Sequence, residues 1–170
     1  CGVRADGSVE CWGREGSAQT PRLRDTVGVA VGYWHACAWT QSGELTCWFI
    51  GDTRPPQVQS KWEQDKAPPV KVSDVCAAAF HSCALLADRS IACWGDNHFG
   101  QTEPPLGTFV DIDCNETHSC AIREGTGKVI CWGAGSEGTP NGESPHFWQS
   151  VVPPNLADSS AARQDTPEQE

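Results

Sequence analysis

Alternating apolar and polar residues mark a short hairpin that occurs four times along the chain. Each copy contains two cysteines, and between them apolar side chains fall on the same face as the cysteines, as strands with one buried face require. The four predicted hairpins span residues 1–13, 37–49, 83–95 and 120–133. Pairing the two cysteines of the first copy also places Val3 opposite Val9, so the cysteine pairing and the apolar pattern specify the same register.

This register predicts the turns as well. In the first copy it leaves a loop of Ala5, Asp6 and Gly7, whose last position suits a left-handed residue such as glycine. Arg89 stands at the glycine position in the third copy, where we expect a strained turn. The register predicts these further apolar pairs: Trp39 with Leu45, Leu85 with Ile91, and Ile122 with Val129.

A further alternating stretch precedes each later hairpin, as in Val27, Val29 and Val31 before the second copy. Each repeat therefore contains at least three short strands, joined by Gly- and Pro-rich connections. Repeats of this size and pattern predict an all-β fold, a partial β-propeller of about four antiparallel blades with a disulfide in each hairpin. A solenoid of β-coils is the alternative, but it would not need paired cysteines in every turn. The tryptophan after each second cysteine is expected to pack between sheets.

Composition sets the expected boundaries. We assign residues 1–155 to the partial propeller, with a possible last strand at 147–152, and residues 156–170 to a disordered acidic tail with little apolar content. Residues 51–70 form a polar, Pro-rich insertion that we expect to be a surface loop at one rim. Because the chain lacks methionine and its first residue is already inside a hairpin, we expect it to be a mature or excised segment.

The ten cysteines indicate an oxidising compartment, and so an extracellular or cell-surface location. None has the short Cys-x2-4-Cys spacing of zinc ligands, so disulfides are favoured over metal. The two cysteines outside the hairpins, Cys76 and Cys114, fall on opposite faces of successive inner strands, which predicts a bridge between the third and fourth repeats. If the blades stack with the opposite hand, both thiols are free. The predicted hairpin bridges are Cys1–Cys11, Cys37–Cys47, Cys83–Cys93 and Cys120–Cys131.

The net charge of −10 disfavours binding to nucleic acid or to an anionic membrane, since both need a basic surface. No apolar stretch is long enough for membrane insertion.

His35, His81 and His118 each stand two residues before the first cysteine of a hairpin. Equivalent positions in different repeats do not converge, so we interpret these histidines as structural residues that cap a neighbouring turn, not as metal ligands.

Asp74, Asp111 and Asp113 could in principle pair as an acid and a base. No nucleophile elbow, zinc-binding helix or phosphate loop accompanies them. We therefore predict no enzyme activity and no cofactor.

Trp62 is the strongest candidate for partner binding, because it lies beside Lys61 and Glu63 in a polar insertion that has no core to fill. An exposed aromatic residue among charges is typical of a protein-binding hot spot, and Arg54 belongs to the same expected surface. Asn115 begins an Asn-x-Thr sequence, which predicts a glycosylation site in a eukaryotic host.

Residues 81–85 (His-Ser-Cys-Ala-Leu) and 93–101 (Cys-Trp-Gly-Asp-Asn-His-Phe-Gly-Gln) resemble the repeat of the regulator of chromosome condensation family, as do residues 107–112 and 118–120. The cysteine-paired version is similar to repeats of secreted bacterial proteins and of crinkly-type plant receptor kinase ectodomains. The resemblance covers about residues 1–133 and is weaker in the second copy, where Phe49 replaces a glycine and the Gly-Gln segment is missing. It implies a seven-bladed β-propeller, of which this chain would hold about half.

The resemblance implies two different functions. Founding nuclear members exchange guanine nucleotide on a small GTPase and bind chromatin, which fits poorly with paired cysteines and an acidic chain. A secreted relative inhibits β-lactamases through loops at one rim. We therefore favour an extracellular, non-enzymatic module that presents rim loops to a protein partner; a GTPase exchange regulator and a structural spacer of a large cell-surface protein are the alternatives. Half a ring also predicts further blades or self-association.

Overall fold

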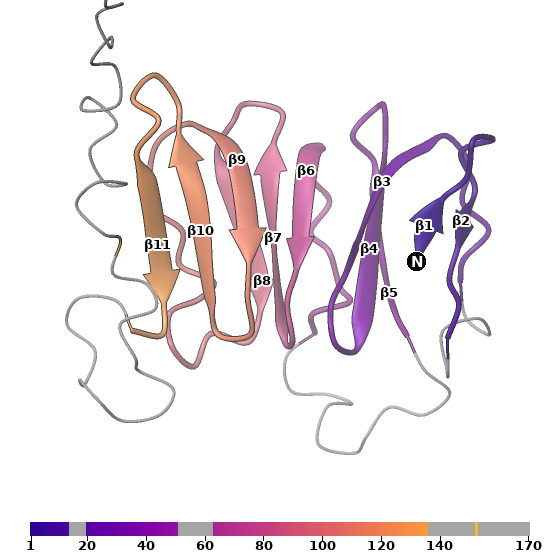
Figure 1. Ribbon diagram of the computed structural model, residues 1–170, viewed down its shortest axis with the longest axis horizontal. Helices are drawn as coiled ribbons and strands as arrows, with labels where there is room; N and C mark the ends of the chain where they lie inside the picture. Colours follow the sequence, from indigo (N-terminus) through magenta and orange to yellow (C-terminus); the bar gives the residue numbers. More distant parts are fainter. Residues whose placement is uncertain (14–19, 51–62, 136–151, 153–170) are drawn as a thin grey trace, which may run out of the picture.

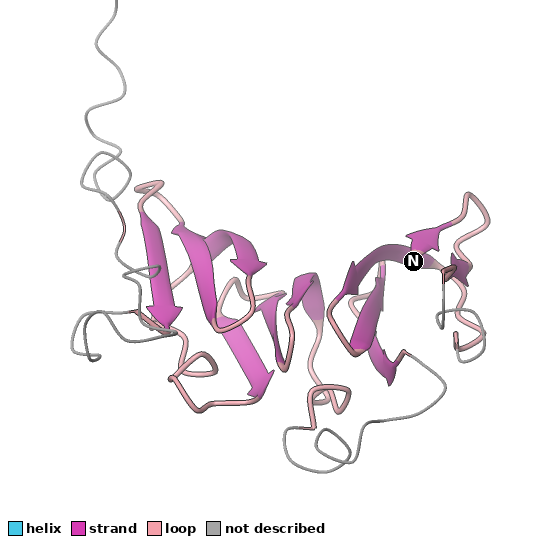
Figure 2. Cartoon of the chain, turned by 60° about the horizontal axis from the view of Figure 1, so that its bottom comes forward, coloured by secondary structure: helices cyan, strands magenta, loops and turns pink. Residues whose placement is uncertain are grey.

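The computed structural model of the protein describes residues 1–13, 20–50, 63–135 and 152. The secondary structure in these ranges consists of β-strands. Figure 2 shows them as separate sheets that lie side by side in an open row. The strands are β1 (Gly2–Val3), β2 (Val9–Glu10), β3 (Thr26–Val31), β4 (His35–Thr40), β5 (Leu45–Phe49), β6 (Val72–Ala77), β7 (His81–Leu86), β8 (Ile91–Gly95), β9 (Phe109–Cys114), β10 (His118–Arg123) and β11 (Val129–Gly133).

These strands form one two-stranded and three three-stranded antiparallel sheets. We call them blade 1 (β1–β2), blade 2 (β3–β5), blade 3 (β6–β8) and blade 4 (β9–β11). In blades 2 to 4 the strand earliest in sequence is the inner strand, and inner strands of successive blades contact each other: β3 contacts β6, and β6 contacts β9. The predicted partial propeller of about four blades is therefore confirmed.

The predicted register is also present. Val3 lies opposite Val9, and the three other apolar pairs expected from the sequence face each other in the same way. All four hairpin disulfides form at the expected cysteines. Cys76 and Cys114 are joined across the boundary between blades 3 and 4, and they do lie on opposite strand faces, because Cys76 pairs with Cys83 whereas Cys114 pairs with Ser119.

Figure 1 shows the hairpin turns between middle and outer strands along one edge, which we call the upper rim; the turns between inner and middle strands lie along the opposite, lower rim. In the upper-rim turns of blades 1 to 3, Gly7 (φ 75°), Gly43 (φ 80°) and Arg89 (φ 67°) are left-handed. In each case its carbonyl oxygen accepts a hydrogen bond from the first residue of the next inner strand, at 3.1, 3.0 and 2.8 Å respectively. Arg89 therefore has the strained conformation that the sequence predicted, and the same turn links blade 3 to blade 4.

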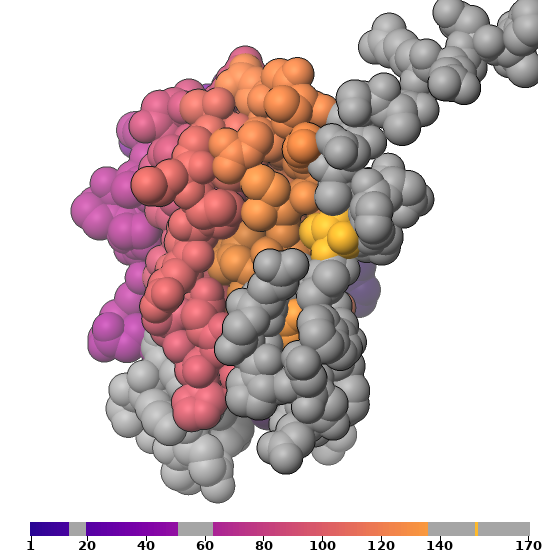
Figure 3. Space-filling model, turned by 90° about the vertical axis from the view of Figure 1, so that its left-hand side faces the viewer, coloured from indigo at the N-terminus to yellow at the C-terminus, as the bar shows by residue number. Residues whose placement is uncertain are grey.

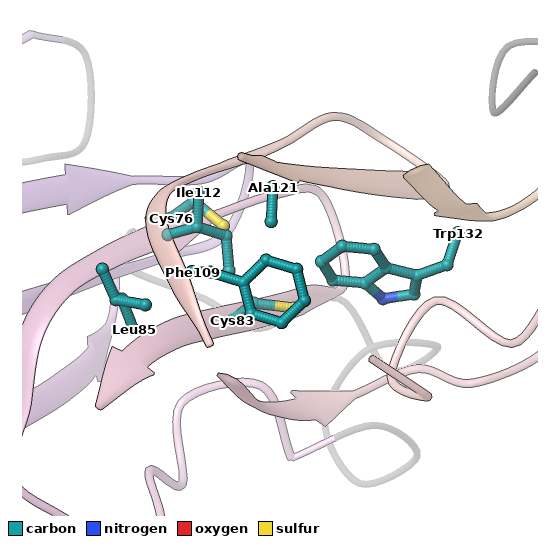
Figure 4. Close-up of a cluster of buried hydrophobic side chains, with 7 residues drawn as sticks. All are labelled: Cys76, Cys83, Leu85, Phe109, Ile112, Ala121 and Trp132. Atoms are coloured by element: carbon teal, nitrogen blue, oxygen red, sulfur yellow. The ribbon is translucent and has the colours of Figure 1, made fainter. Parts of the chain in front are cut away.

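The largest core cluster lies between blades 3 and 4 (Figure 4). Phe109 at the start of β9 is fully buried among side chains from both blades, and the sulfur atoms of the bridge at Cys76 are part of the same cluster. Its buried members are Cys76, Cys83, Leu85, Phe109, Ile112, Ala121 and Trp132.

The tryptophan expected between sheets behaves differently in blade 1. Trp48 and Trp132 are buried, but 68% of Trp12 is exposed. In blades 3 and 4 the indole Nε1 donates a hydrogen bond to the connection that arrives from the preceding blade. The prediction of a buried tryptophan is therefore wrong for Trp12.

Blade 4 forms the other end of the row, and Figure 3 shows the molecule from that side. A cavity of about 200 Å³ opens on its end face, and Asp111, Asp113, Ile122 and Val129 are among the residues that line it. The outward face of a terminal sheet is where another blade packs in a propeller. Completion of the ring by further blades or by self-association stays a prediction.

Several expectations concern residues outside the described ranges, namely Arg54, Lys61, Trp62, the strand proposed at 147–152 apart from Val152, and the tail at 156–170. In the described ranges, no helix has the length and hydropathy needed to cross a membrane.

Candidate binding surface

The repeat-bound histidines connect neighbouring blades. His35 Nε2 of blade 2 lies 2.6 Å from Ser82 Oγ of blade 3, and His81 Nε2 lies 2.8 Å from Ser119 Oγ of blade 4. All four side chains are completely buried. His35 and His81 therefore bind a middle strand of the next blade, and the prediction that these two histidines cap a turn is wrong.

Burial dominates the electrostatics of these imidazoles. Desolvation lowers the pKa of His35 and of His81 to about 4, because a charged ring is poorly solvated between two sheets. The pKa of His118, which is half-buried at the end of the row, is lowered in the same direction by burial. His35 and His81 are therefore neutral at physiological pH, and each forms a hydrogen bond to a serine of the next blade.

A second contact between blades uses the tryptophan of the outer strand. Trp132 Nε1 donates to the carbonyl oxygen of Gln101 at 3.0 Å, and Trp94 Nε1 donates to that of Gln64 at 2.9 Å. Gln64 and Gln101 are both about 1% exposed. Gln64 therefore supplies in the second repeat the glutamine that we expected to be missing, and the prediction of a surface loop across 51–70 is wrong at this residue.

The aspartates near the inner strands bind their own backbone. One carboxylate oxygen of Asp74, Asp111 and Asp113 accepts the N–H of the following residue, at 2.8, 2.9 and 2.8 Å. Burial raises the pKa of Asp74, and the neighbouring carboxylates of Asp111 and Asp113 add to the shift. These contacts give the aspartates a structural role in the strands.

One sulfur cluster has the spacing of a metal site. The Sγ atoms of Cys76, Cys83 and Cys114 all lie within 4.8 Å of one another. Each of them is already bonded in a disulfide, either Cys76–Cys114 or Cys83–Cys93, so none has a thiolate to offer a metal.

The most prominent exposed aromatic group lies on the lower rim of blade 2. The side chain of Tyr33, in the turn between β3 and β4, is 75% exposed. Its ring centroid lies 6.3 Å from that of Trp34, and Trp34 in turn stacks on Phe49 with ring planes 6° apart and centroids 6.3 Å apart. We call these three residues the aromatic rim.

The aromatic rim departs from the repeat most clearly at Tyr33 and Phe49. Tyr33 and Trp34 correspond to Ala79 and Phe80 in blade 3, and to Glu116 and Thr117 in blade 4. The residue equivalent to Phe49 is glycine in those blades, where an added Cβ would approach a backbone carbonyl oxygen to 2.5 or 2.7 Å.

The backbone beneath the aromatic rim is fixed. The N–H of Tyr33 donates to the carbonyl oxygen of Ala78 in blade 3 at 3.2 Å, and the carbonyl oxygen of Trp34 accepts from Ile50 at 2.8 Å. Phe49 is 6% exposed and supports the Trp34 ring from below. The Tyr33 ring is thus held on a preorganised base without a core contact of its own, which is typical of a binding hot spot.

The sequence did not single out Tyr33, although a comparison of the repeats contains the signal: an aromatic residue where the other blades have alanine and glutamate. Trp62, Lys61 and Arg54 belong to the segment that follows Ile50, and the described residues do not test their predicted role.

Asn115 lies in the lower-rim turn of blade 4 and is exposed. Its Oδ1 accepts the N–H of Glu116 at 2.7 Å, and its own N–H donates to the carbonyl oxygen of His118 at 2.8 Å. Glycosylation of this exposed residue stays a prediction.

Comparison with known proteins gives the same picture as the geometry. Antiparallel blades joined around an axis by repeated contacts define a β-propeller repeat protein. The sequence model of the Regulator of chromosome condensation (RCC1) repeat matches residues 72–101 and 109–139, which are the third and fourth repeats. The chain therefore contains repeats of the RCC1 type within a β-propeller fold.

Two curated relatives illustrate the range of the family. The serine/threonine-protein kinase-like protein CCR4 of Arabidopsis thaliana is 34% identical over 53 residues, which are 31% of this chain and 6% of that protein. The probable E3 ubiquitin-protein ligase HERC4 of Homo sapiens is 28% identical over 134 residues, which are 66% of this chain and 13% of that protein. The chain therefore spans a small part of the length of both.

Solved structures show the same fold. The CRINKLY WD40 ectodomain of the Arabidopsis thaliana receptor kinase ACR4 superposes with a TM-score of 0.60 at 24% identity, over 76% of this chain and 45% of that one. Prp20p of Saccharomyces cerevisiae superposes with a TM-score of 0.54 at 17% identity, over 66% of this chain and 34% of that one. The chain covers less than half of either propeller.

Proposed function

We propose that this chain is part of an extracellular, non-enzymatic β-propeller that binds a protein partner at the aromatic rim of blade 2. The observation that carries the proposal is Tyr33, which is 75% exposed on a backbone fixed from both sides. The candidate chemical residues described above are held by the fold: His35 and His81 contact the next blade, Asp74 binds its own backbone, and Cys76 is in a disulfide.

Three further facts support this function. The five disulfides fit an oxidising compartment, and the ACR4 structure that the chain resembles is described as an ectodomain. Prp20p is described by its binding to Gsp1p and histones, so proteins of this fold bind other proteins. The net charge of −10 makes histone-like basic partners electrostatically possible but opposes nucleic acid.

The lower rim can be tested against the upper rim within the same chain. We would replace either Tyr33 or Leu106, which is 93% exposed on the connection to blade 4, with a photo-crosslinking amino acid and irradiate the full chain in extracellular fluid from its source. The proposal predicts one defined protein adduct from position 33 and none from position 106. Equal labelling from both positions, or none from position 33, would contradict it.

A substitution series then measures how much Tyr33 contributes to the binding free energy. Tyr33→Ala should weaken binding of the crosslinked protein at least tenfold, as a hot-spot aromatic residue does, while thermal stability stays unchanged because the side chain has no core contact. Leu106→Ala is the control and should leave affinity unchanged. The earlier expectation for Trp62 predicts a similar loss for Trp62→Ala.

The alternative function, nucleotide exchange on a small GTPase, makes the opposite prediction about redox state. Binding at the aromatic rim depends on disulfide-linked blades and should disappear in a dithiol reductant. Exchange activity on a purified GTPase that persists in the same reductant would favour the alternative.

A further inference from the structure

A cavity of about 370 Å³ opens on the upper rim, between the turn that joins β4 to β5 in blade 2 and the start of β6 in blade 3. Its volume is in the range of small-ligand pockets. It lies on the rim opposite Tyr33, so it is separate from the protein-binding surface proposed above.

The apolar wall of this cavity is specific to blade 2. Trp39 lines it, where blades 3 and 4 have Leu85 and Ile122. Its cross-strand partner is Gly28, whereas the partners in blades 3 and 4 are Asp74 and Asp111. A Cβ at Gly28 would lie 2.1 Å from Cζ2 of the indole. Glycine therefore makes the space that the indole occupies, and the two departures from the repeat belong together.

The opposite wall has several short polar side chains. Thr40 and Ser42 share a hydrogen bond between their hydroxyl groups at 2.9 Å, and Ser73 donates its hydroxyl to the carbonyl oxygen of Leu85 at 3.2 Å. Each hydroxyl oxygen keeps lone-pair capacity, and the exposed Gln41 adds an amide with both donors and an acceptor. The cavity thus presents several short hydrogen-bonding groups beside one aromatic ring.

The charge balance restricts the ligand. Among the described residues that line the cavity, Lys71 is the charged one, and its Nζ lies 3.5 Å from the Glu44 carboxylate in an exposed ion pair. No unpaired charge remains there to hold an ion. The net charge of −10 on the chain also disfavours anionic ligands.

We propose that this cavity binds a neutral hexose unit of a carbohydrate. A pyranose ring has an apolar face of C–H groups, which carry a slight positive charge and are attracted to the negative face of the indole. Its hydroxyl groups both donate and accept, which matches the hydroxyl and amide groups around Trp39. An aromatic residue with several uncharged hydrogen-bonding side chains is the combination that a neutral sugar requires.

The experiment is a titration of the full chain with neutral hexoses and short neutral oligosaccharides, followed by saturation-transfer NMR and calorimetry. Trp39→Leu installs the residue of blade 3 and should weaken sugar binding at least tenfold. Gln41→Ala changes an exposed side chain and should weaken it severalfold, so the test stands even if the tryptophan variant is unstable.

Matched controls separate the two proposals. Tyr33→Ala should lose the protein partner and keep the sugar, whereas Trp39→Leu should do the reverse. The sugar proposal is wrong if no neutral sugar binds, if only uronic acids bind in a manner that depends on Lys71, or if an extended peptide binds at this cavity instead. Binding that Trp39→Leu and Gln41→Ala both leave unchanged would also overturn it.

Discussion

The contact between His81 and Ser119 predicts how strongly blades 3 and 4 depend on one hydroxyl group. Ser119→Ala removes the partner of His81 Nε2, and both side chains are completely buried. An imidazole nitrogen left without a hydrogen bond at such a site costs about 1–3 kcal/mol. Alanine itself suits the strand, because Ala36 occupies the same position in blade 2. The cost therefore reports the lost hydrogen bond, not a distorted backbone.

The assay is equilibrium unfolding of the oxidised full chain in urea. A loss of this size should lower the urea midpoint by on the order of 1 M at an unchanged m-value. In a His81→Phe background the same Ser119→Ala change should cost almost nothing, because no ring nitrogen is left unpaired.

The reverse substitution, Ala36→Ser in blade 2, provides the control. Ala36 is completely buried, and the described part of blade 1 supplies no histidine to face it, so in this chain the hydroxyl added by Ala36→Ser would be buried without a partner. That variant should also lose stability, which shows that the hydroxyl stabilises only where a histidine faces it. A change below about 0.5 kcal/mol for Ser119→Ala, or an equal cost in the His81→Phe background, would refute this reasoning.

Three further predictions concern pH, a turn and a close contact. Burial lowers the pKa of His35 and His81 from 6.5 to about 4, so between these pH values the unfolded chain binds more protons than the folded chain. The free energy of unfolding should therefore fall as pH drops from about 6.5 to about 4. Urea midpoints that stay constant over this range would contradict the prediction. Arg89→Gly should raise the melting temperature by a few degrees, because a left-handed non-glycine residue costs about 1–2 kcal/mol. The control Arg89→Ala should bring no gain, because alanine keeps the backbone strain and the variant loses only an exposed ion pair with Glu124. Gly28→Ala should destabilise the chain by about 1–3 kcal/mol in the same urea assay, because its Cβ would lie 2.1 Å from an indole carbon; an unchanged midpoint would show that the indole moves freely.

The hairpins and their disulfides could be predicted because two independent patterns specify the same register. Period-two alternation places Leu85 and Ile91 on one face, and the cysteines on either side of them allow only one pairing of the strands. The bridge from Cys76 to Cys114 could be inferred from side-chain parity along successive inner strands.

Contacts that depend on how one blade stacks on the next were harder to predict. The repeated His-Ser-Cys sequence contains both partners of the bond between His81 and Ser119, but the direction of stacking is needed to see that they belong to different blades. Gln64 was missed because the connection before it is longer than in the third repeat, so its distance from the preceding tryptophan differs. Tyr33 was missed because exposure is not a property of local sequence.

The shared sulfur cluster has a consequence for the order in which the chain matures. Repeats 1 and 2 each contain two cysteines and can complete their own oxidation as they are synthesised. Repeat 3 contains three, and Cys83 has both Cys76 and Cys93 as direct cross-strand neighbours. Until Cys114 has been synthesised, one of these thiols has no correct partner and can compete for Cys83 by thiol–disulfide exchange. Repeats 3 and 4 therefore mature as one oxidation unit, and a chain that ends between them would keep an odd thiol.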